Sequence, residues 1–554
     1  MSALRRTGPD GRFASPVMLL VSAAGLSACA LALYAHAEWP WLLLGWFALV
    51  PWLASLDHTA STRGALVGGL FMSQALIITC YYWLPSAIRD YSGISWGLCL
   101  FVIMLAAPLL EPQFIALALT RRFTRTGIFC RMPLAPLAGA CAYVGAEWAI
   151  PKLFPATLGH PLFGSTLLRQ GADVAGAHGL TFMLLLANDC VLAIIRGARS
   201  RTGKTEKRWR APAACLAVLI LVPLGYGALR FKQFNTPGAG TDTLTAGLVQ
   251  AGLSDYDRLA AEFGAYDTVR TILDTHEELS LALLARRDID LIVWPETVYP
   301  LTFNSPESED GQALDLSIEE FVTGIGVPLA FGAYDIEEGQ RFNAAFFLSP
   351  LPDNGMIFTS YRKSRLFPFT EWAPPLFDNP DVRARMPWLG DWTPGSGARA
   401  VFLRLADGRT VGIAPLICYD ALDPAHVIAA VRAGGDVILT LSNDSWFAYG
   451  NIPRFILMLS AFRSIETRRP QLRATNTGIT AVIAPTGEIV DMLDVNTRGV
   501  LVGSVNPGSG KTLMLLLGDW FGPAALAAAL LMLGAALTAR SRKMNPSTGS
   551  LKRL

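Results

Sequence analysis

The sequence predicts an α-helical membrane domain of about eight transmembrane helices joined to a separate α/β domain. Three observations support this fold class. The chain of 554 residues has a mean hydropathy of +0.37 with only 16% charged residues, which is too apolar for a wholly soluble protein. Apolar runs of membrane-spanning length recur before residue 235. From residue 242 onward, short apolar runs alternate with polar stretches, as strands and helices of an α/β domain do.

The apolar runs place seven expected spans before the α/β segment and one after it. They cover residues 17–35, 39–56, 64–88, 95–119, 134–150, 176–195, 211–230 and 513–538. The first run contains LSAC at 26–29, which is similar to a lipoprotein cleavage site. Because its apolar stretch continues to Tyr34, we expect an uncleaved helix.

The distribution of basic residues predicts how the spans are oriented. Loops on the cytoplasmic side of a membrane are enriched in lysine and arginine. Both termini and the connections after the fourth and sixth runs carry such residues, so the segment from about 235 to 510 is expected outside the cytoplasm. These residues are Arg5, Arg6, Arg12, Arg121, Arg122, Arg125, Arg131, Arg196, Arg199, Arg201, Lys204, Lys207, Arg208, Arg210, Arg540, Arg542, Lys543, Lys552 and Arg553.

Composition also excludes several classes of function. A net charge of +2, with the basic residues in short separate clusters, argues against a nucleic-acid-binding protein. The sequence has no metal-ligand cluster and no phosphate-binding glycine loop, so we expect no metal and no cofactor. Glu111 and Asp189 fall inside apolar runs, where an ionisable group is expected to face a cavity or a partner.

The α/β segment is expected to contain buried strands whose carboxyl ends carry polar residues. The predicted strands are LTAGLVQ, DLIVWPE, PLAFGAYD, NAAFFLSP, TVGIAPLICYD, DVILTLSND and ITAVIAPTG, with helices over about 256–286, 424–434 and 453–468. Three of these strands end in Glu296, in Cys418 to Asp420, and in Asn443 and Asp444. Because the carboxyl ends of strands line the ligand crevice of an α/β sheet, these residues predict a site.

Cys418 is the one cysteine of the eight that falls in the α/β segment, and it is either an inert buried residue or a nucleophile. A nucleophilic thiol needs a base and a nearby positive charge. His276 and His426 do not follow predicted strands, which makes a Cys/His pair the weaker arrangement. We therefore favour a triad in which Glu296 takes the thiol proton and Lys363 stabilises the thiolate and the oxyanion.

Three motifs then resemble a known family. WPET around Glu296, YRKSRLFPFTEW around Lys363 and ICYD around Cys418 resemble the Glu-Lys-Cys motifs of the carbon-nitrogen hydrolase (nitrilase) superfamily. Together with the spans, they make the chain similar to the apolipoprotein N-acyltransferase family of the bacterial inner membrane. The resemblance implies a nitrilase-like αββα sandwich on the periplasmic side. It also implies a membrane domain at 1–235, the hydrolase domain at 242–507, a last transmembrane helix at 512–539 and a basic cytoplasmic tail at 540–554.

The resemblance further implies an activity and its partners. Cys418 would take an acyl chain from a membrane phospholipid as a thioester and pass it to the α-amino group of the diacylglyceryl-cysteine of an apolipoprotein. No cofactor is implied, and the lipid bilayer is the third partner. The supporting or substrate-binding residues that the resemblance points to are Glu371, Tyr419, Asp420, Asn443 and Trp446.

The chain also departs from the family's pattern. Asp420 stands where the family usually has glutamate, Arg365 stands where histidine commonly follows the lysine, and the segment LVQAGLSDYDRL is not followed by the usual tryptophan. These departures concern the identity of donor and acceptor. A membrane-anchored nitrilase-like amidase, an acyltransferase with another amine acceptor and a lipid-binding protein without catalysis are the alternatives.

Overall fold

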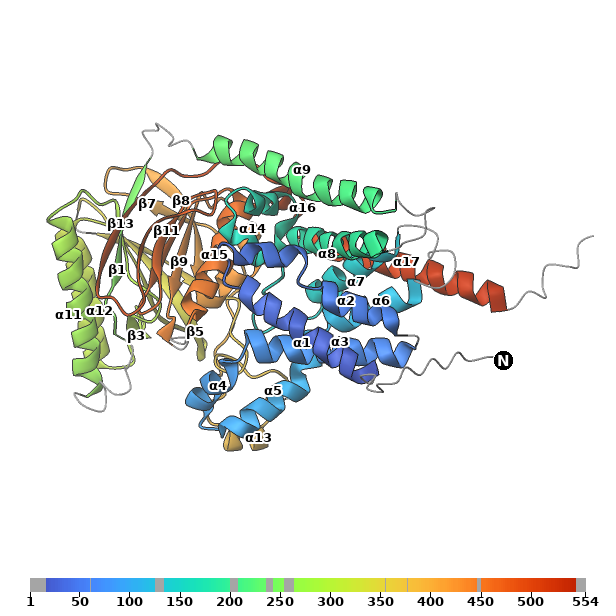
Figure 1. Cartoon of the computed structure of the whole chain (residues 1–554). Helices are drawn as coiled ribbons and strands as arrows, with labels where there is room; N and C mark the ends of the chain where they lie inside the picture. Colours follow the sequence, from blue (N-terminus) through green and yellow to red (C-terminus); the bar gives the residue numbers. More distant parts are fainter. Residues whose placement is uncertain are drawn as a thin grey trace, which may run out of the picture.

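The computed structural model describes residues 16–59, 61–124, 134–199, 208–235, 243–253, 264–353, 355–375, 377–445 and 450–544. A group of helices from the N-terminal half lies beside an α/β domain from the C-terminal half, and the last helix returns to the first group (Figure 1). Trp446 lies outside the described residues, as do Arg125, Arg131, Arg201, Lys204, Lys207 and the basic residues before 16 and after 544.

The N-terminal part consists, in its described residues, of helices and the loops that join them. Its helices are α1 (Pro16–Tyr34), α2 (Val50–His58), α3 (Thr62–Cys80), α4 (Leu84–Ser92), α5 (Trp96–Leu110), α6 (Gln113–Thr124), α7 (Leu134–Ala149), α8 (Ala172–Arg199) and α9 (Arg210–Phe234). Of the described helices, five are long and apolar enough to cross a membrane, or six if the pair α5 and α6, bent by 45°, is one span.

The expected count of about eight spans is therefore not confirmed, and several runs break where a single helix was predicted. Residues 39–56 form a 3-10 turn, Trp41–Trp46, followed by the nine-residue helix α2, because Pro51 begins a new helix. The run at 64–88 ends its helix at Cys80, and α4 starts again with Pro85 in its first turn. With 16 residues, α7 is about 24 Å long, shorter than the hydrocarbon core of a bilayer.

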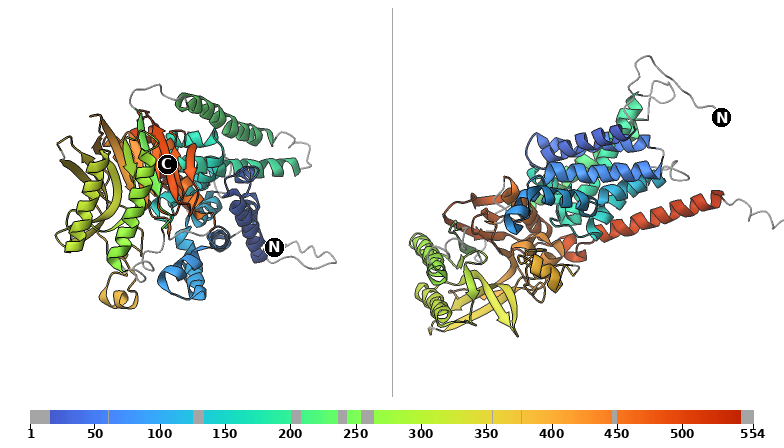
Figure 2. Two further views of the ribbon diagram at one scale, coloured as in Figure 1. Left: turned by 90° about the vertical axis from the view of Figure 1, so that its left-hand side faces the viewer. Right: turned by 90° about the horizontal axis from the view of Figure 1, so that it is seen from below.

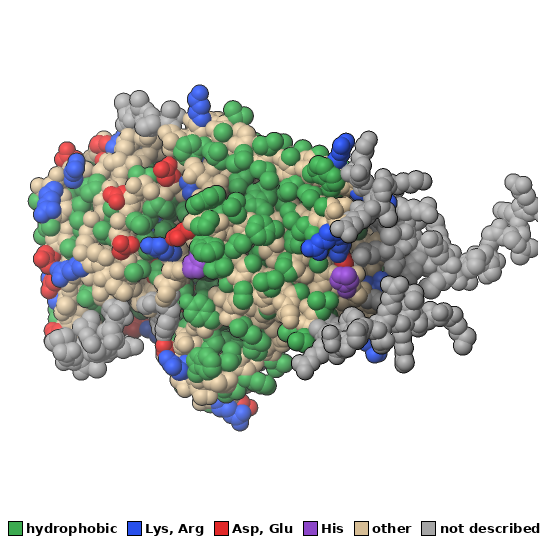
Figure 3. All heavy atoms as spheres, viewed as in Figure 1, with side chains coloured by type: hydrophobic (Ala, Val, Ile, Leu, Met, Phe, Trp, Pro, Cys, Tyr) green, Lys and Arg blue, Asp and Glu red, His purple; other side chains and the backbone are tan. Residues whose placement is uncertain are grey.

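The surface of the helical part is apolar. In Figure 3, hydrophobic side chains cover the face formed by the helices, whereas acidic and basic side chains are spread over the α/β domain. On α9, Val218, Leu221, Val222 and Leu229 are all more than half exposed. An apolar surface of this extent fits contact with lipid acyl chains.

At one end of these helices, charged residues form a buried cluster. Arg121, near the end of α6, contacts Asp57 of α2 at 2.8 Å and Asp189 of α8 at 2.6 Å, and Arg196 of α8 contacts Asp57 as well. Asp189 therefore faces a partner, as expected. The contacts also place the ends of α2, α6 and α8 at the same side of the bundle.

The α/β domain consists, in its described residues, of two sheets. One has the order β13-β1-β2-β4-β5-β6, with β3 paired to β4, and the other has the order β12-β11-β10-β9-β8-β7. The first contains β1 (Leu244–Gln250), β2 (Leu291–Val293), β3 (Tyr299–Thr302), β4 (Leu329–Glu337), β5 (Gln340–Pro350), β6 (Met356–Arg362) and β13 (Gly499–Val505). The second contains β7 (Val401–Arg404), β8 (Thr410–Ile417), β9 (Val437–Ser442), β10 (Gln471–Thr475), β11 (Thr480–Ile483) and β12 (Ile489–Leu493).

The two sheets pack face to face and helices cover their outer faces (Figure 2). Leu248 and Val293 of the first sheet share a core with Ile413 and Leu439 of the second. Helices α11 (Ala265–Leu284) and α12 (Glu309–Ile325) pack on the first sheet. Helices α14 (Pro424–Arg432) and α15 (Ile452–Thr467) pack on the second. This is the expected αββα arrangement.

Helix α15 joins the two parts of the molecule. Leu457 and Ala461 pack against β11, while Met458, Phe462 and Ile465 belong to the core of the N-terminal helices. All residues of α15 except Arg454 and Phe455 are buried, because one face meets the sheet and the other meets the bundle. The same bundle includes α17 (Phe521–Met544), which packs closely on α7. A Cβ placed on Gly145 of α7 would lie 2.6 Å from the Cα of Leu526.

Candidate active site

The polar residues that follow β2, β8 and β9 are brought toward one another where the two sheets meet. Glu296 follows β2 in the first sheet, and Cys418 and Asn443 follow the parallel neighbours β8 and β9 in the second. The backbone N–H of Asn443 donates to Glu296 Oε2 at 2.7 Å. This hydrogen bond connects the strand ends of the two sheets directly.

Lys363 lies between two glutamates. Its Nζ donates to Glu296 Oε1 at 3.1 Å and to Glu371 Oε1 at 2.6 Å. Lys363 is 2% exposed and Glu296 is 4% exposed, so water screens this charge cluster very little. Burial alone would lower the pKa of Lys363. The two carboxylates outweigh this effect and raise the pKa well above its usual value. Lys363 is therefore a fixed cation.

The carboxylates of this cluster have further donors. Asn343 of β5 donates from Nδ2 to Glu296 Oε1 at 2.7 Å, and the backbone N–H of Phe367 donates to Glu371 Oε2 at 2.6 Å. All four oxygens of Glu296 and Glu371 thus accept a hydrogen bond, which locks their orientation. We call Glu296, Lys363 and Glu371 the candidate cluster.

Cys418 occupies a strained position beside the candidate cluster. Its φ is +47°, in the left-handed region that residues with a Cβ rarely adopt, and it begins the 3-10 turn Cys418–Leu422. A sharp turn at the end of a strand presents the thiol at the edge of the sheet. Such strain requires surrounding structure to hold it, and Asp420 supplies that structure.

Asp420 is completely buried and connects the turn to the segment that carries Lys363. Its Oδ2 accepts from the backbone N–H of Ile417 at 3.0 Å and from the Tyr361 hydroxyl at 2.9 Å. Its Oδ1 accepts from the backbone N–H of Arg365 at 2.7 Å and that of Ser364 at 3.2 Å. The shorter aspartate therefore makes a full set of hydrogen bonds at the position where the family usually has glutamate.

The charge state of the thiol follows from these surroundings. Burial raises the pKa of Cys418, the Glu296 carboxylate raises it further, and Lys363 opposes both. Burial also raises the pKa of Glu296, against the lowering effect of Lys363. The resting site therefore holds a protonated thiol beside a carboxylate whose affinity for a proton is increased.

Neither histidine of the domain faces the thiol. His276 packs against Trp294, beneath the outer face of the first sheet, and its ring Nδ1 lies 2.7 Å from the Ile272 carbonyl. His426 Nε2 lies 2.8 Å from the Tyr361 hydroxyl. The structure therefore gives no Cys/His pair in the described residues.

The other predicted supporting residues have structural contacts. The Tyr419 hydroxyl donates to the carbonyl of Leu153 at 2.7 Å, in the connection that follows α7. The Asn443 side chain accepts from the backbone N–H of Ser445 at 3.3 Å, while its own backbone N–H donates to Glu296. Arg365, at the position of the family's histidine, pairs with Asp423 at 2.6 Å. Trp446 is not described.

Sequence reasoning missed Asn343 and Arg473. Asn343 is the first residue of the apolar strand predicted from NAAFFLSP, yet its side chain donates to Glu296. Arg473 is buried in β10 and contacts Asp444 Oδ2 at 2.7 Å, behind the strand end that holds Asn443. A polar residue at the start of an apolar strand is the signal that could have indicated Asn343, whereas Arg473 needed the pairing of β9 with β10.

Comparisons with known proteins agree with both parts of this molecule. The carbon-nitrogen hydrolase family matches residues 246–513, and the apolipoprotein N-acyltransferase N-terminal domain matches residues 27–190. An apolipoprotein N-acyltransferase of Geobacter metallireducens is 30% identical over 503 residues, 90% of this chain and 92% of that protein. One from Rhodopseudomonas palustris is 26% identical, with 96% of this chain and 98% of that protein covered.

Among solved structures, a nitrilase-superfamily protein of Saccharomyces cerevisiae matches part of this chain. It is 14% identical with a TM-score of 0.35, and the match covers 56% of this chain and 97% of that protein.

Proposed function

The chain belongs to the apolipoprotein N-acyltransferase family, and we propose on this premise that it transfers an acyl chain from a membrane phospholipid to the α-amino group of an apolipoprotein's N-terminal diacylglyceryl-cysteine. Cys418 carries the acyl chain between the two substrates as a thioester. The observation on which this proposal rests is the buried cluster in which Lys363 bridges Glu296 and Glu371 next to the strained Cys418.

In the first half-reaction, the Cys418 sulfur attacks an ester carbonyl of the phospholipid. The thiol proton moves to Glu296, whose raised pKa favours its acceptance. This transfer removes the negative charge on Glu296 that opposes the thiolate, so the net charge of the site stays constant. Lys363 and the backbone N–H of Tyr419 hold the oxyanion. The ester C–O bond then breaks, and Glu296 returns the proton to the oxygen of the leaving lysophospholipid.

In the second half-reaction, the neutral amine of the diacylglyceryl-cysteine attacks the thioester carbonyl. An N–C bond forms, the C–S bond breaks, and the proton lost by the nitrogen passes through Glu296 to the Cys418 sulfur. The amide is a more stable product than the thioester, which favours transfer in this direction. Glu371 keeps Lys363 in place through both steps, since its own oxygens are fixed by Lys363 and Phe367.

The membrane placement that fits this reaction has the α/β domain, 242–507, on the periplasmic side of the bacterial inner membrane. The domain assignment follows with it: 1–235 and 512–539 in the membrane and 540–554 in the cytoplasm. The contacts that gather Asp57, Arg121 and Arg196 at one end of the bundle support a common, basic side for the connections after α6 and α8. About eight spans agree with both termini lying on that side.

The intact mass of the purified full-length protein, incubated with phospholipid and no acceptor, tests the proposal. We expect a gain of one acyl chain that hydroxylamine removes, absent in Cys418→Ala and present in Cys215→Ala, which changes an exposed cysteine of α9. Adding a diacylglyceryl-cysteine peptide should discharge the wild-type thioester onto its amine. A wild-type protein that gains no mass from phospholipids of several headgroups contradicts the proposal.

A further inference from the structure

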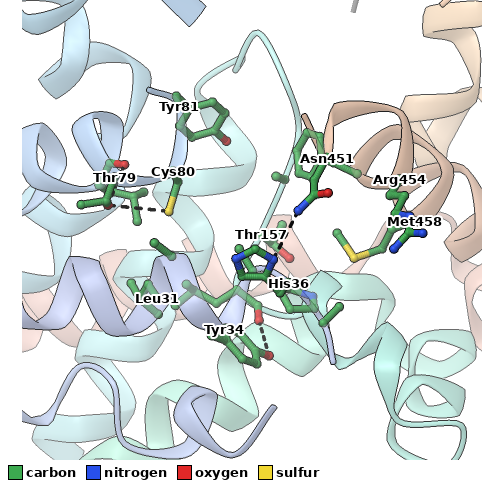
Figure 4. A pocket seen from close by; sticks show the side chains of 18 of the residues that line it. Leu31, Tyr34, His36, Thr79, Cys80, Tyr81, Thr157, Asn451, Arg454 and Met458 are labelled. Atoms are coloured by element: carbon green, nitrogen blue, oxygen red, sulfur yellow. Dashed lines mark hydrogen bonds between the residues drawn. The ribbon is translucent and has the colours of Figure 1, made fainter. Parts of the chain in front are cut away.

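A further buried cluster of charged residues lies in the helical part, at a cavity that does not include Cys418. The cavity has a volume of about 800 Å³ and is lined by α1, α3, α7 and the start of α15. Figure 4 shows the side chains of His36 and Asn451 pointing toward each other in its lining, and Asn451 Nδ2 lies 3.3 Å from His36 Nδ1. Most of its wall is apolar, with Leu31, Leu76 and Met458 among the lining side chains.

Lys152 stands at the centre of the polar part of this wall. Its Nζ donates to Glu111 Oε2 at 3.1 Å, to Glu147 Oε1 at 3.0 Å and to the Ala156 carbonyl at 3.2 Å. Gln113 donates from Nε2 to the same oxygen of Glu111. The three N–H groups of the Lys152 ammonium are therefore all used, and it has no donor left for another group. We call Glu111, Gln113, Glu147 and Lys152 the membrane cluster.

Two acceptors of the membrane cluster have no hydrogen-bond partner. They are Gln113 Oε1 and Glu147 Oε2, and the two residues are 1% and 6% exposed. Two carboxylates and one ammonium leave this cluster with one net negative charge. A buried acceptor without a donor and a buried charge without a counter-ion both cost free energy. The cluster therefore lacks a cation that can donate hydrogen bonds.

We propose that this cavity binds the primary ammonium of a membrane amphiphile, with Glu147 and Gln113 accepting its N–H groups and the apolar wall receiving its acyl chains. An ammonium supplies three donors and one positive charge, which are what the membrane cluster lacks. The inference rests on the proposed function, because both substrates of that reaction are amphiphiles of the membrane. The ammonium belongs either to an aminophospholipid headgroup or to the N-terminus of a diacylglyceryl peptide.

The cavity is connected to the candidate active site through the chain that follows α7. The Tyr419 hydroxyl donates to the carbonyl of Leu153, the residue directly after Lys152. Phe154 packs in one cluster with Tyr419 and Phe367, and the backbone N–H of Phe367 donates to Glu371 Oε2. An amphiphile held by the membrane cluster thus lies against the wall that supports the turn of Cys418.

Binding of two pairs of lipids to the full-length wild-type protein in detergent, measured as occupancy by native mass spectrometry, tests the inference. The first pair is a dialkyl-ether phosphatidylethanolamine and its N-acetyl form, which carry no glycerol ester for Cys418 to attack. The second pair is a diacylglyceryl-cysteine peptide with a free and with an acetylated amine. We expect the free amine of at least one pair to bind about tenfold more tightly, and that pair identifies the source of the ammonium.

Variants locate the recognition. Glu147→Gln and, separately, Gln113→Met should reduce the ratio of the affinity for the free amine to that for the acetylated amine to about one. Gln113→Met does so while the ion pairs of Lys152 stay in place. Asp189→Asn, which removes a membrane carboxylate that pairs with Arg121, should keep the ratio. Equal binding of both members of each pair by the wild type overturns the inference, and so does a ratio that survives both variants.

Thioester formation from an ester phospholipid is recorded on the same preparation. If the thioester forms but the protein does not prefer the free amine, this inference is overturned and the proposed function stands. If the protein prefers the free amine but no thioester forms, the proposed function is overturned and this inference stands.

Discussion

In the described residues, two buried Glu-Lys-Glu clusters have similar geometry and different completeness. In the candidate cluster, Lys363 lies 3.1 and 2.6 Å from Glu296 and Glu371. In the membrane cluster, Lys152 lies 3.1 and 3.0 Å from Glu111 and Glu147. All four carboxylate oxygens of the first accept hydrogen bonds, whereas Glu147 Oε2 of the second accepts none. The amide oxygen next to the carboxylates, Asn343 Oδ1 in the first and Gln113 Oε1 in the second, has no partner in either.

The difference separates two uses of the same residue types. Complete hydrogen bonding fixes the groups of the candidate cluster before substrate arrives, and a nucleophilic thiol stands beside them, which suits chemistry. Unused acceptors in an apolar cavity leave room for a ligand's donors, which suits binding. The first cluster should therefore govern the rate of reaction, and the second should govern the affinity for substrate.

The largest expected effect is that of Glu296→Gln, which removes the proposed general base. Thioester formation should fall about 10³-fold. In the wild type, the rate should fall as pH falls through the pKa of Glu296, which burial raises above the ordinary 4.5, because only the carboxylate accepts the thiol proton. Single-turnover rates across pH measure both. If the rate of Glu296→Gln still falls at low pH as the wild-type rate does, another group is the base.

The second prediction compares the two lysines. Lys363→Met should lower kcat about 10²-fold, because it removes a charge that holds the oxyanion. Lys152→Met, the matched change in the membrane cluster, should change KM and leave kcat close to the wild-type value, because this cluster lies outside the candidate active site. Steady-state kinetics with varied phospholipid and varied lipopeptide separate the two effects. If Lys152→Met lowers kcat as much as Lys363→Met does, the membrane cluster governs the rate of reaction as well, and the distinction between the two clusters is wrong.

The third prediction concerns Asp420. Asp420→Glu should reduce the free energy of unfolding by about 2 kcal/mol, because a completely buried side chain with four donors around it cannot gain a methylene without displacement. Asp274→Glu, which lengthens an exposed carboxylate on α11, should change it far less. Denaturant unfolding of the α/β domain in the full-length protein measures both. A neutral Asp420→Glu would mean that the site accommodates either residue.

The smallest expected effect is that of Tyr419→Phe. Loss of the hydrogen bond to Leu153 should cost about 1 kcal/mol, which is about a fivefold decrease in kcat/KM, since the turn of Cys418 loses one support. Tyr266→Phe on the exposed side of α11 is the control. No change in Tyr419→Phe would mean that the two clusters act independently.

Sequence reasoning identified the site in part because of where strands end. Glu296, Cys418 and Asn443 each follow an apolar run, and the carboxyl ends of strands meet at one edge, so their proximity could be expected. Short edge strands such as β7 and β12, and helix α12, went unrecognised, since their apolar positions are few and are divided between two faces. Broken spans were missed for another reason: hydropathy averages over the prolines that end α-helices.

The sequence by itself determined the class of the molecule and the groups available for chemistry. Hydropathy separates lipid-facing helices from a folded domain, and one cysteine, one lysine and one glutamate stand in motifs that resemble a family. Only the tertiary structure decided which charges meet. Lys363 lies 67 positions from Glu296, and Lys152 lies 41 from Glu111. Local patterns do not report contacts at such separations, because these contacts form only after strands from two sheets, or helices of one bundle, have packed together.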